Sequence, residues 1–256
     1  MIRRILVVGY GLIAYLVFLA VFVYTVGFLA NAVVPRGIDD GAVGPVWIAV
    51  LVNAGLLGAF AVQHTVMARP AFKRWLTRFL PASIERSTFV LAASLVLVAV
   101  VWWWQPLPAT VWSVDAGWLR VALWAVYLFG WVTVVGSTFM INHVDLFGLS
   151  QVVADARARE HVPPSFRLTL LYRFVRHPIM VGFLIAFWAT PDMSQGRLLF
   201  AALGTGYILV GVRFEEHDLR HDLGEDYTRY EAEVPRFVPR VGQGRQRQPA
   251  GMDGQV

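Results

Sequence analysis

The sequence contains no cysteine, and charged residues make up only 15% of its 256 residues. Without cysteine there is no disulfide, no thiolate metal site and no cysteine nucleophile, so any sulfur chemistry must belong to a ligand. Hydrophobic residues make up 57% of the chain, which leaves too little polar surface for a soluble domain of this size. The composition therefore predicts an integral-membrane protein.

Common nucleotide-binding signatures are also absent. The sequence has no P-loop, and the Gly-x-Gly of Gly9 and Gly11 lies inside an apolar run without the third glycine of a Rossmann fingerprint. The net charge of +5 could suggest nucleic acid, but the basic residues flank the apolar runs. We therefore predict the lipid bilayer as a partner, with no nucleic acid and no bound metal. The first apolar run lacks a small-residue cleavage site, so we expect it to remain as an anchor.

Four charge-free runs are long enough to cross the hydrocarbon core of a membrane, which takes about 20 helical residues. They are residues 5–35, 41–68, 87–114 and 121–144. Two shorter runs follow at residues 177–191 and 198–212. A helix of that length rises only about 22 Å. We expect these two runs to form a hairpin that turns at residues 191–196.

The predicted fold is an all-α, polytopic helical bundle with four full spans, a short C-terminal hairpin and a cytoplasmic C-terminal segment that binds a cofactor. We divide the chain into a four-span bundle at residues 1–144, a functional module at 145–240 and a disordered tail at 241–256. If the N-terminus is inside, 19 of the 22 basic residues fall on the inner side and 3 on the outer side. We therefore expect the cytoplasmic membrane as location, with both termini in the cytoplasm.

Arg176, His177 and Pro178 stand where the predicted hairpin enters the membrane, and Gly182 follows one turn later. Proline suits a first helical turn, where its missing N–H costs nothing. The free N–H groups of such a helix start, with Arg176 beside them, favour an anion such as a carboxylate. Gly182 would let a ligand or a neighbouring helix approach the backbone. An interfacial Arg-His pair with a glycine packing contact explains the same residues without any ligand.

Glu215 and Glu216 stand where the hairpin leaves the membrane. The functional interpretation is that one of them accepts hydrogen bonds from ribose hydroxyls or a ligand ammonium; ordinary pairing with nearby arginines on a solvated helix is the alternative. Gly224 predicts the end of the helix, and Tyr227 and Tyr230 follow on an amphipathic turn. Cations at the entry and carboxylates at the exit favour a zwitterionic, ribose-bearing cofactor at the membrane surface.

Two further histidines stand at the cytoplasmic ends of predicted spans. His64 closes the second span, and His143 closes the fourth, with Asp145 two residues later. An ionisable residue at membrane depth is costly and is a candidate functional residue, although an isolated interfacial histidine is the simpler alternative. Haem ligation by His64, His143 and His177 is a third interpretation. None of the three lies in the middle of a span, and the Cys-x-x-Cys-His attachment motif is absent.

The C-terminal motifs resemble those of the isoprenylcysteine carboxyl methyltransferase and phospholipid methyltransferase superfamily of membrane enzymes. The similar segments are the Arg-His-Pro block at 176–178, the run from Glu215 to Tyr230, and the Val-Pro-Arg and Pro-Arg ending at 234–240. Met180 departs from the pattern, because the superfamily often has tyrosine at that position. Any role of that tyrosine in the cofactor pocket is absent here or has moved.

Two segments narrow the resemblance. Residues 63–69 are similar to a segment of NnrU-type membrane proteins, and residues 142–151 resemble the methanethiol S-methyltransferase subgroup, with similarity over nearly the whole chain to residue 240. This resemblance implies an S-adenosyl-L-methionine-dependent enzyme that methylates methanethiol to dimethyl sulfide by in-line displacement at a sulfonium methyl. It implies a cofactor pocket that begins at Arg176, His177 and Pro178, has Glu216 and Glu215 at its polar end, and is closed by Tyr227, Tyr230 and Arg236.

The chemistry that the resemblance implies needs a thiolate, yet simple thiols titrate near or above about 8.5. We predict His143, oriented by Asp145, as the base that removes the thiol proton, and His64 as the second candidate. Positioning and water exclusion without a side-chain base are the alternative. Two other functions remain open: methylation of a prenylated or lipid acceptor, and a non-enzymatic membrane sensor or assembly factor of the NnrU type.

Overall fold

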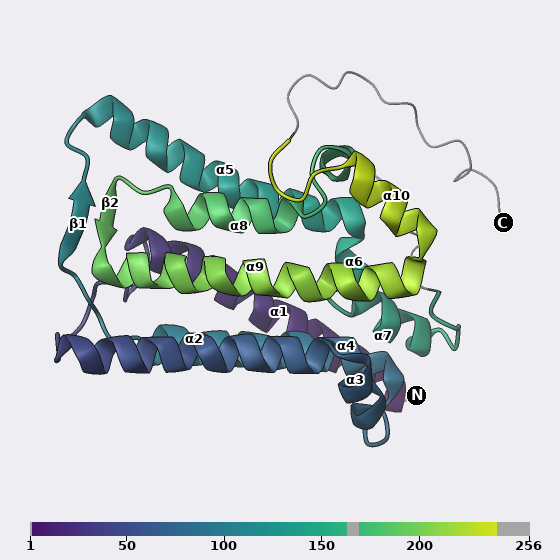
Figure 1. The fold of residues 1–256 in the computed structure, drawn as a ribbon. Helices are drawn as coiled ribbons and strands as arrows, with labels where there is room; N and C mark the ends of the chain where they lie inside the picture. Colours follow the sequence, from purple (N-terminus) through teal and green to yellow (C-terminus); the bar gives the residue numbers. More distant parts are fainter. Residues whose placement is uncertain (1, 163–168, 240–256) are drawn as a thin grey trace.

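The computed structural model describes residues 2–162 and 169–239, so the tail predicted at 241–256 lies outside the described residues. Long helices run side by side, and a two-stranded ribbon joins them at one end (Figure 1). The elements in chain order are α1 (Ile2–Ala30), α2 (Val46–Ala68), α3 (Pro70–Leu76), α4 (Ala82–Trp103), β1 (Thr110–Ser113), α5 (Gly117–Ile141), α6 (His143–Leu146), α7 (Leu149–Ala156), the 3-10 helix η1 (Leu170–Arg173), α8 (Pro178–Trp188), β2 (Asp192–Ser194), α9 (Gln195–Leu223) and α10 (Glu225–Glu233).

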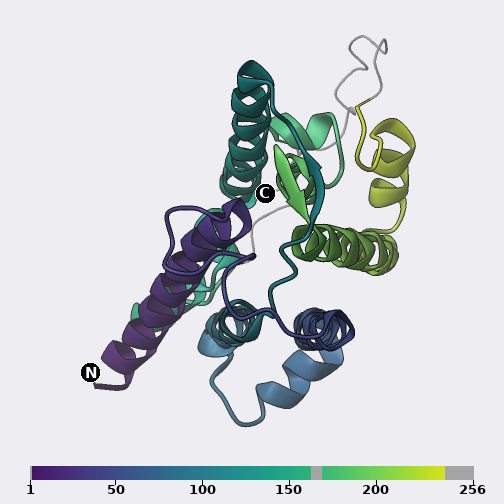
Figure 2. The ribbon, with the colours of Figure 1, turned by 90° about the vertical axis from the view of Figure 1, so that its left-hand side faces the viewer.

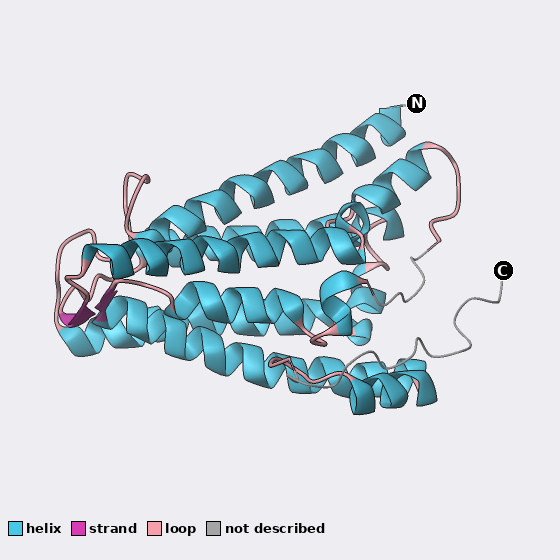
Figure 3. Ribbon diagram, turned by 90° about the horizontal axis from the view of Figure 1, so that it is seen from above, coloured by secondary structure: helices cyan, strands magenta, loops and turns pink. Residues whose placement is uncertain are grey.

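The two ends of the bundle differ in what they carry. The start of α1 lies at the same end as α3, α6, α7 and α10, and we call this the terminal end (Figure 1). Figure 3 shows the N-terminus at this end and the magenta strands at the other end. The ribbon of β1 and β2 lies at the opposite end, which we call the strand end. Seen from the strand end, α5 and α8 lie opposite α2 and α4, with α9 beside them (Figure 2).

Five helices of the described residues are long and apolar enough to cross a membrane, namely α1, α2, α4, α5 and α9. Large apolar side chains on these helices point outward, such as Leu12 on α1 and Val121 and Val132 on α5. Lipid tails solvate such side chains, whereas water would not. The structure confirms the predicted all-α membrane bundle, and it describes a multi-pass membrane protein. The division of the chain at residue 144 stays a prediction.

The C-terminal hairpin is present, but its two arms are unequal. α8 has only 11 residues, whereas α9 has 29 and continues well past Val212, where the predicted arm ended. The charges that begin at Arg213 mark the end of the apolar run and not the end of the helix. Charged residues four positions apart can pair along a helix and so support it beyond the membrane, as Glu216 and Arg220 do. α9 ends where Gly224 adopts a φ of 57°.

Two glycines bring α5 and α8 into close contact. A Cβ atom on Gly182 would lie 2.7 Å from the carbonyl oxygen of Gly130 and 2.8 Å from the backbone nitrogen of Val134. A Cβ on Gly130 would lie 2.7 Å from the backbone nitrogen of Ala186. Small residues let transmembrane backbones pack closely and gain dispersion contacts, which drive helix association in lipid. Gly182 therefore serves helix packing, and α5 fixes the place of α8.

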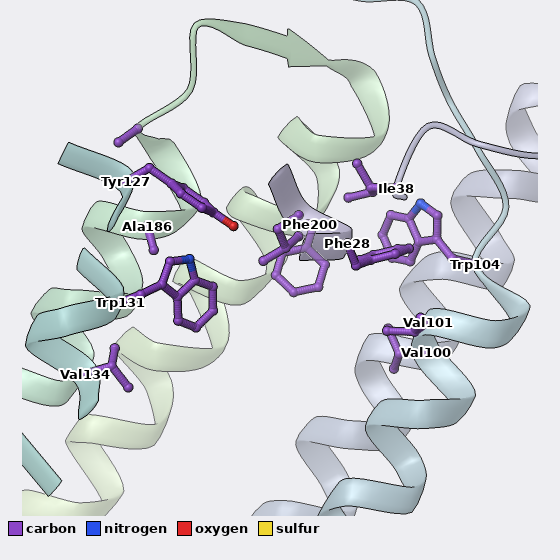
Figure 4. Close-up of a cluster of buried hydrophobic side chains, with 12 residues drawn as sticks. Phe28, Ile38, Val100, Val101, Trp104, Tyr127, Trp131, Val134, Ala186 and Phe200 are labelled. Carbon is purple, nitrogen blue, oxygen red and sulfur yellow. The ribbon is translucent and has the colours of Figure 1, made fainter. Parts of the chain in front are cut away.

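The main hydrophobic core lies toward the strand end. Figure 4 shows Tyr127, Trp131 and Ala186 on one side and Phe28 and Trp104 on the other, with Phe200 of α9 between them. Trp131 makes edge-to-face contacts with Phe22 and Phe183, at 5.3 and 5.8 Å between ring centroids. Such aromatic pairs add stability beyond the area that they bury.

The strand end is closed by backbone pairing. β1 and β2 are antiparallel, with Trp112 opposite Met193 and Ser113 opposite Asp192. Arg120 at the start of α5 forks onto the Asp192 carboxylate, with Nη1–Oδ1 at 2.9 Å and Nη2–Oδ2 at 2.5 Å. The ribbon was not predicted from the sequence; it ties the α4–α5 connection to the turn of the hairpin.

Candidate functional site

The segment after α10 folds back over the start of α8 at the terminal end. The backbone N–H of Arg176 donates to the carbonyl oxygen of Pro235 at 2.9 Å, and the N–H of His177 donates to that of Arg236 at 3.3 Å. Arg176 also reaches over the end of α10, where its Nη1 donates to the carbonyl oxygens of Glu231 and Val234, both at 2.8 Å. These bonds bring motifs that are far apart in sequence into one cluster.

Glu216 is the centre of this cluster and is fully buried. Its Oε1 accepts hydrogen bonds from Nε and Nη2 of Arg176, at 3.0 and 2.8 Å, and from Nε of Arg236 at 3.1 Å. Nε2 of His177 lies 3.1 Å from the same oxygen, and Nη2 of Arg236 donates to Oε2. A buried carboxylate is tolerated when it is paired and hydrogen-bonded in this way. Both oxygens of Glu216 therefore face cations of the protein, so this residue orients Arg176, His177 and Arg236.

Glu215 differs from its neighbour in exposure. Its side chain is 51% exposed, and its Oε2 lies 3.5 Å from Nδ1 of His177. Because the oxygens of Glu216 are already engaged, Glu215 is the carboxylate of the predicted pair with hydrogen-bonding capacity to spare. The family resemblance implied both glutamates at the polar end of a pocket, and the structure gives them different surroundings.

A second ion pair closes the cluster on the outside. Nε and Nη2 of Arg220 donate to Oε2 and Oε1 of Glu231, both at 2.8 Å. The hydrogen bonds from Arg220 lower the pKa of the Glu231 carboxyl, and the hydrogen bond to Glu216 raises the pKa of the Arg236 guanidinium. Sequence analysis missed Glu231, because the turn at Gly224 separates it from Arg220 and no helical spacing connects them.

The two tyrosines of α10 are buried in different ways. The hydroxyl of Tyr230 donates to the carbonyl oxygen of Tyr172 at 2.7 Å and so ties α10 to η1. The hydroxyl of Tyr227 is buried and has no hydrogen-bond partner among the described residues. Burial raises the pKa of Tyr227 to about 12, so its hydroxyl stays protonated and can donate a hydrogen bond. An unpaired buried hydroxyl is unusual and suggests a ligand contact.

Pro178 is the first residue of α8, as predicted, and the N–H of Val181 bonds to the carbonyl oxygen of His177 at 3.0 Å. Met180 follows within the first turn. Gly182, which was predicted as a cofactor contact, instead faces α5, where Gly130 leaves room for it. The alternative interpretation of Gly182 as a packing residue is the one that the structure favours.

His143, the first residue of α6, lies in a cage of aromatic rings to which α1 and α5 contribute. Its ring stacks on Phe139 at 4.2 Å and lies edge-on to Tyr15 at 5.7 Å. Nε2 lies 2.8 Å from the hydroxyl of Tyr15, and Nδ1 lies 2.8 Å from Oγ1 of Thr138. Because the Thr138 hydroxyl donates to the carbonyl oxygen of Val135, it accepts from Nδ1–H, and Nε2 accepts from Tyr15. Burial lowers the pKa of His143, which favours this neutral form.

Asp145 does not orient His143, which corrects that prediction. The fourth predicted span ran to residue 144, but α5 ends at Ile141. The side chain of Asn142 then caps α6 by accepting from the backbone N–H of Asp145 at 3.2 Å. The new direction points the Asp145 carboxylate at His161, whose Nε2 lies 2.5 Å from Oδ1. The thiol base assigned to His143 stays a prediction, now without its orienting carboxylate.

His64 lies near the end of α2 in a second aromatic cage. Phe60 stacks on its ring at 5.3 Å, Phe89 of α4 lies at 4.8 Å, and Tyr207 of α9 lies edge-on at 6.4 Å. Nδ1 of His64 is buried and has no hydrogen-bond partner in the described part of the chain. The three histidines that were considered for haem thus lie in three separate surroundings.

Arg86 near the start of α4 was not singled out from the sequence. Its guanidinium lies over the ring of Phe89, with Cζ 5.1 Å from the ring centroid, and its Nε donates to the carbonyl oxygen of Leu146 at 2.8 Å. Among the five basic residues between 69 and 86, the sequence offers no pattern that separates Arg86 from the others. Only the fold shows that Phe89 contacts both Arg86 and His64.

Comparison with known proteins places this geometry in context. The chain is 54% identical over 237 residues to a methanethiol S-methyltransferase of Mycobacterium tuberculosis. The aligned residues are 93% of this chain and 97% of that protein. The chain is 47% identical over 243 residues to methanethiol S-methyltransferase 2 of Bradyrhizobium diazoefficiens, or 94% and 93% of the two chains. Nurim of Bos taurus is 28% identical over 177 residues, which are 66% of this chain and 67% of that protein. No family model and no solved structure matches the chain.

Proposed function

The chain belongs to the methanethiol S-methyltransferase family, and from this premise we propose that it transfers a methyl group from S-adenosyl-L-methionine to methanethiol and releases dimethyl sulfide. The observation that carries the proposal is the cluster of Arg176, His177 and Arg236 around the buried Glu216. Replacing buried ion pairs with apolar residues is often neutral or stabilising, so stability alone does not account for such a cluster. A zwitterionic methyl donor at the bilayer edge needs fixed groups of both signs.

The side chains of the cluster suit the polar groups of this donor. Nε and Nη2 of Arg236 are engaged with Glu216, and the side chain is still 37% exposed, which leaves Nη1 for a carboxylate. Glu215 is the half-exposed acceptor for an ammonium group or for ribose hydroxyls. The unpaired hydroxyl of Tyr227 supplies one further donor. The residues present therefore fit the donor, with Glu216 acting through the cations that it orients.

Once bound, the donor supplies an electrophilic methyl group on a positively charged sulfur. In-line displacement requires that the thiol sulfur is held opposite the breaking bond. Fixed orientation of two reactants supplies a large part of a rate enhancement, and exclusion of water strengthens the electrostatic contacts. The aromatic cages around His64 and His143 are suited to orient a small apolar thiol and to exclude water from it.

The proposed orientation puts the terminal end in the cytoplasm. Its basis is the charge distribution: Arg36, Arg120 and Arg197 lie at the strand end, and the terminal halves of the helices and their connections carry the other basic residues of the described chain. Reporter fusions after Gly41 and after Gln151 are expected to lie on opposite sides of the membrane. Equal sidedness at these two points would contradict the orientation.

Purified protein in lipid nanodiscs tests the function directly. With labelled S-adenosyl-L-methionine and methanethiol, we expect labelled dimethyl sulfide in the headspace and an equal amount of S-adenosylhomocysteine. Arg236→Met should weaken donor binding in calorimetry by at least about tenfold, because each lost charge-assisted hydrogen bond is worth roughly 1.5–3 kcal/mol. Arg229→Met, at an exposed arginine of α10, is the matched control.

Two results would overturn the proposal in different ways. Absence of donor binding to the wild-type protein would remove the methyltransferase assignment to this cluster. Methylation of a prenylated cysteine with no dimethyl sulfide from methanethiol would support the donor site but would mean that the acceptor is a lipid and not methanethiol.

A further inference from the structure

His64 carries a feature that the donor cluster does not explain. Its ring is held by Phe60, Phe89 and Tyr207, which belong to three different helices, and its Nδ1 is buried without a hydrogen-bond partner in the described residues. An unpaired buried polar atom destabilises a protein, so each one in a native structure calls for an explanation, such as contact with a ligand.

His143 shows that an aromatic cage does not by itself leave an imidazole unpaired. It is also surrounded by rings, yet both of its nitrogens are bonded, one to Tyr15 and one to Thr138. A base must have a lone pair that can approach the proton that it removes. With its proton on Nε2, His64 offers such a lone pair at the unbonded Nδ1, whereas the lone pair of His143 is directed at the hydroxyl of Tyr15.

A cation completes the surroundings of His64. Arg86 lies over the face of Phe89, whose ring also contacts His64. In the described residues, the hydrogen bonds of Arg86 use Nε alone, so its two terminal nitrogens keep their donors. A guanidinium with free donors beside an apolar cage stabilises an anion that forms there.

The same helix links this cage to the donor cluster. Tyr207 lines the cage, and Glu215 stands eight residues later on α9, which corresponds to about 12 Å along the helix axis. An acceptor in the cage and a donor at the cluster are thereby held by one rigid element. The cage itself offers rings and one basic nitrogen, which suits a small, polarizable thiol, because sulfur packs favourably against aromatic rings.

We propose that the cage of Phe60, His64, Phe89 and Tyr207 is the thiol site, in which Nδ1 of His64 removes the thiol proton and Arg86 stabilises the thiolate. This inference rests on the proposed function. The S–H bond breaks and its proton passes to Nδ1. The sulfur lone pair forms the new bond to the methyl carbon, and the carbon–sulfonium bond breaks with its electron pair remaining on the departing sulfur. The products are dimethyl sulfide, neutral S-adenosylhomocysteine and an imidazolium that returns its proton to water.

His64→Phe tests the proposal, because it keeps an aromatic ring in the cage and removes the base. We expect kcat/KM for methanethiol to fall by roughly 10²–10⁴-fold at pH 7, the usual contribution of a general base. The defect should shrink as pH rises toward the pKa of the thiol, where the thiolate forms without help. Donor affinity in calorimetry should stay within about twofold of wild type, since the donor cluster is untouched.

His143→Phe and His217→Ala complete the experiment. His143→Phe should give a smaller defect that is the same at every pH, because it removes contacts to Tyr15 and Thr138 and not a base. His217 is exposed on α9, and its alanine variant should match wild type. A pH-dependent defect in His143→Phe with none in His64→Phe would overturn the proposal and assign the base to His143. A wild-type protein that binds the donor but methylates no thiol would overturn this proposal together with the proposed acceptor.

Discussion

Each end of the bundle contains an arginine–carboxylate contact between distant parts of the chain, and the two contacts differ in almost every other respect. At the strand end, Arg120 and Asp192 are 37% and 49% exposed and lie beside a backbone ribbon and the main apolar core. At the terminal end, Glu216 is 0% exposed and is bonded to Arg176, His177 and Arg236. Apolar packing holds one end, and a buried ionic cluster holds the other.

The comparison distinguishes an ion pair that helps to close the fold, at the strand end, from an ionic cluster that forms a candidate site, at the terminal end. An exposed ion pair contributes little, and the strand end does not depend on it, because β1, β2 and the aromatic core already fix the geometry. Among residues 2–162 and 169–239, the local core at the terminal end is the small cluster of Tyr227, Tyr230 and Val234. The charges of this end are expensive to bury, so their arrangement points to a charged ligand.

The largest expected effect comes from removing the central carboxylate of the terminal end. Glu216→Gln leaves the buried Arg176 without the charge of its main partner, and breaking a buried pair in this way costs about 3–5 kcal/mol. Donor binding in calorimetry should be lost, and the midpoint of unfolding should fall. Asp192→Asn is the matched change at the strand end and should leave donor affinity unaltered. Equal effects of the two variants would contradict the distinction between the ends.

The next effect concerns the helix pair that joins the ends. Gly182→Ala places a methyl group within 2.7 Å of backbone atoms of α5, and overpacking of this kind costs typically 1–3 kcal/mol. α8 should shift at its start, where Arg176 and His177 stand, so donor affinity should fall together with thermal stability. Gly136→Ala on α5 has nothing within 4 Å and should be neutral or slightly stabilising. A neutral Gly182→Ala would mean that α5 does not fix the position of α8.

Much of this comparison could be predicted from the sequence. Charge-free runs predicted α1, α2, α4 and α5 but not the full length of α9. Gly224 predicted the end of α9, and the motifs gave a resemblance to methanethiol S-methyltransferases that the relatives confirm. These features are local, since each depends on composition or on spacing along a helix. The same is true of Pro178, whose missing N–H favours the first turn of α8.

The features that escaped prediction depend on contacts between distant segments. The ribbon has strands of four and three residues, and their register is set by the helices that they connect. The end of α5 at Ile141 was missed because the charge-free run continues to residue 144, and the break after Ile141 directs Asp145 toward His161. Arg86 and Glu231 carry no local signal, because their partners lie on other elements.

A smaller effect of opposite signs is expected for the two tyrosines of α10. Tyr227→Phe removes a buried hydroxyl without a partner, so the protein without ligand should gain up to about 1–3 kcal/mol. Donor affinity should fall at the same time if this hydroxyl contacts the ligand. Tyr230→Phe is the control: it removes the bond to Tyr172 and should destabilise the protein by about 1 kcal/mol. A Tyr227→Phe variant with unchanged donor affinity would remove this hydroxyl from the site.

The smallest effect belongs to the exposed pair of the strand end. The hydrogen bond from Arg120 lowers the pKa of Asp192 below its ordinary value of 3.8, and Ser113 adds a second bond at 2.7 Å. A carboxyl group with a lowered pKa contributes stability that is present above 3.8 and is lost as the pH falls through its folded-state value. Thermal unfolding of wild type and Asp192→Asn should therefore differ slightly at pH 6 and converge below that value. Because both side chains are well exposed, added salt should reduce the difference at pH 6. A large, salt-resistant difference would mean that the strand end depends on its ion pair as the terminal end does, and the contrast between the two ends would fail.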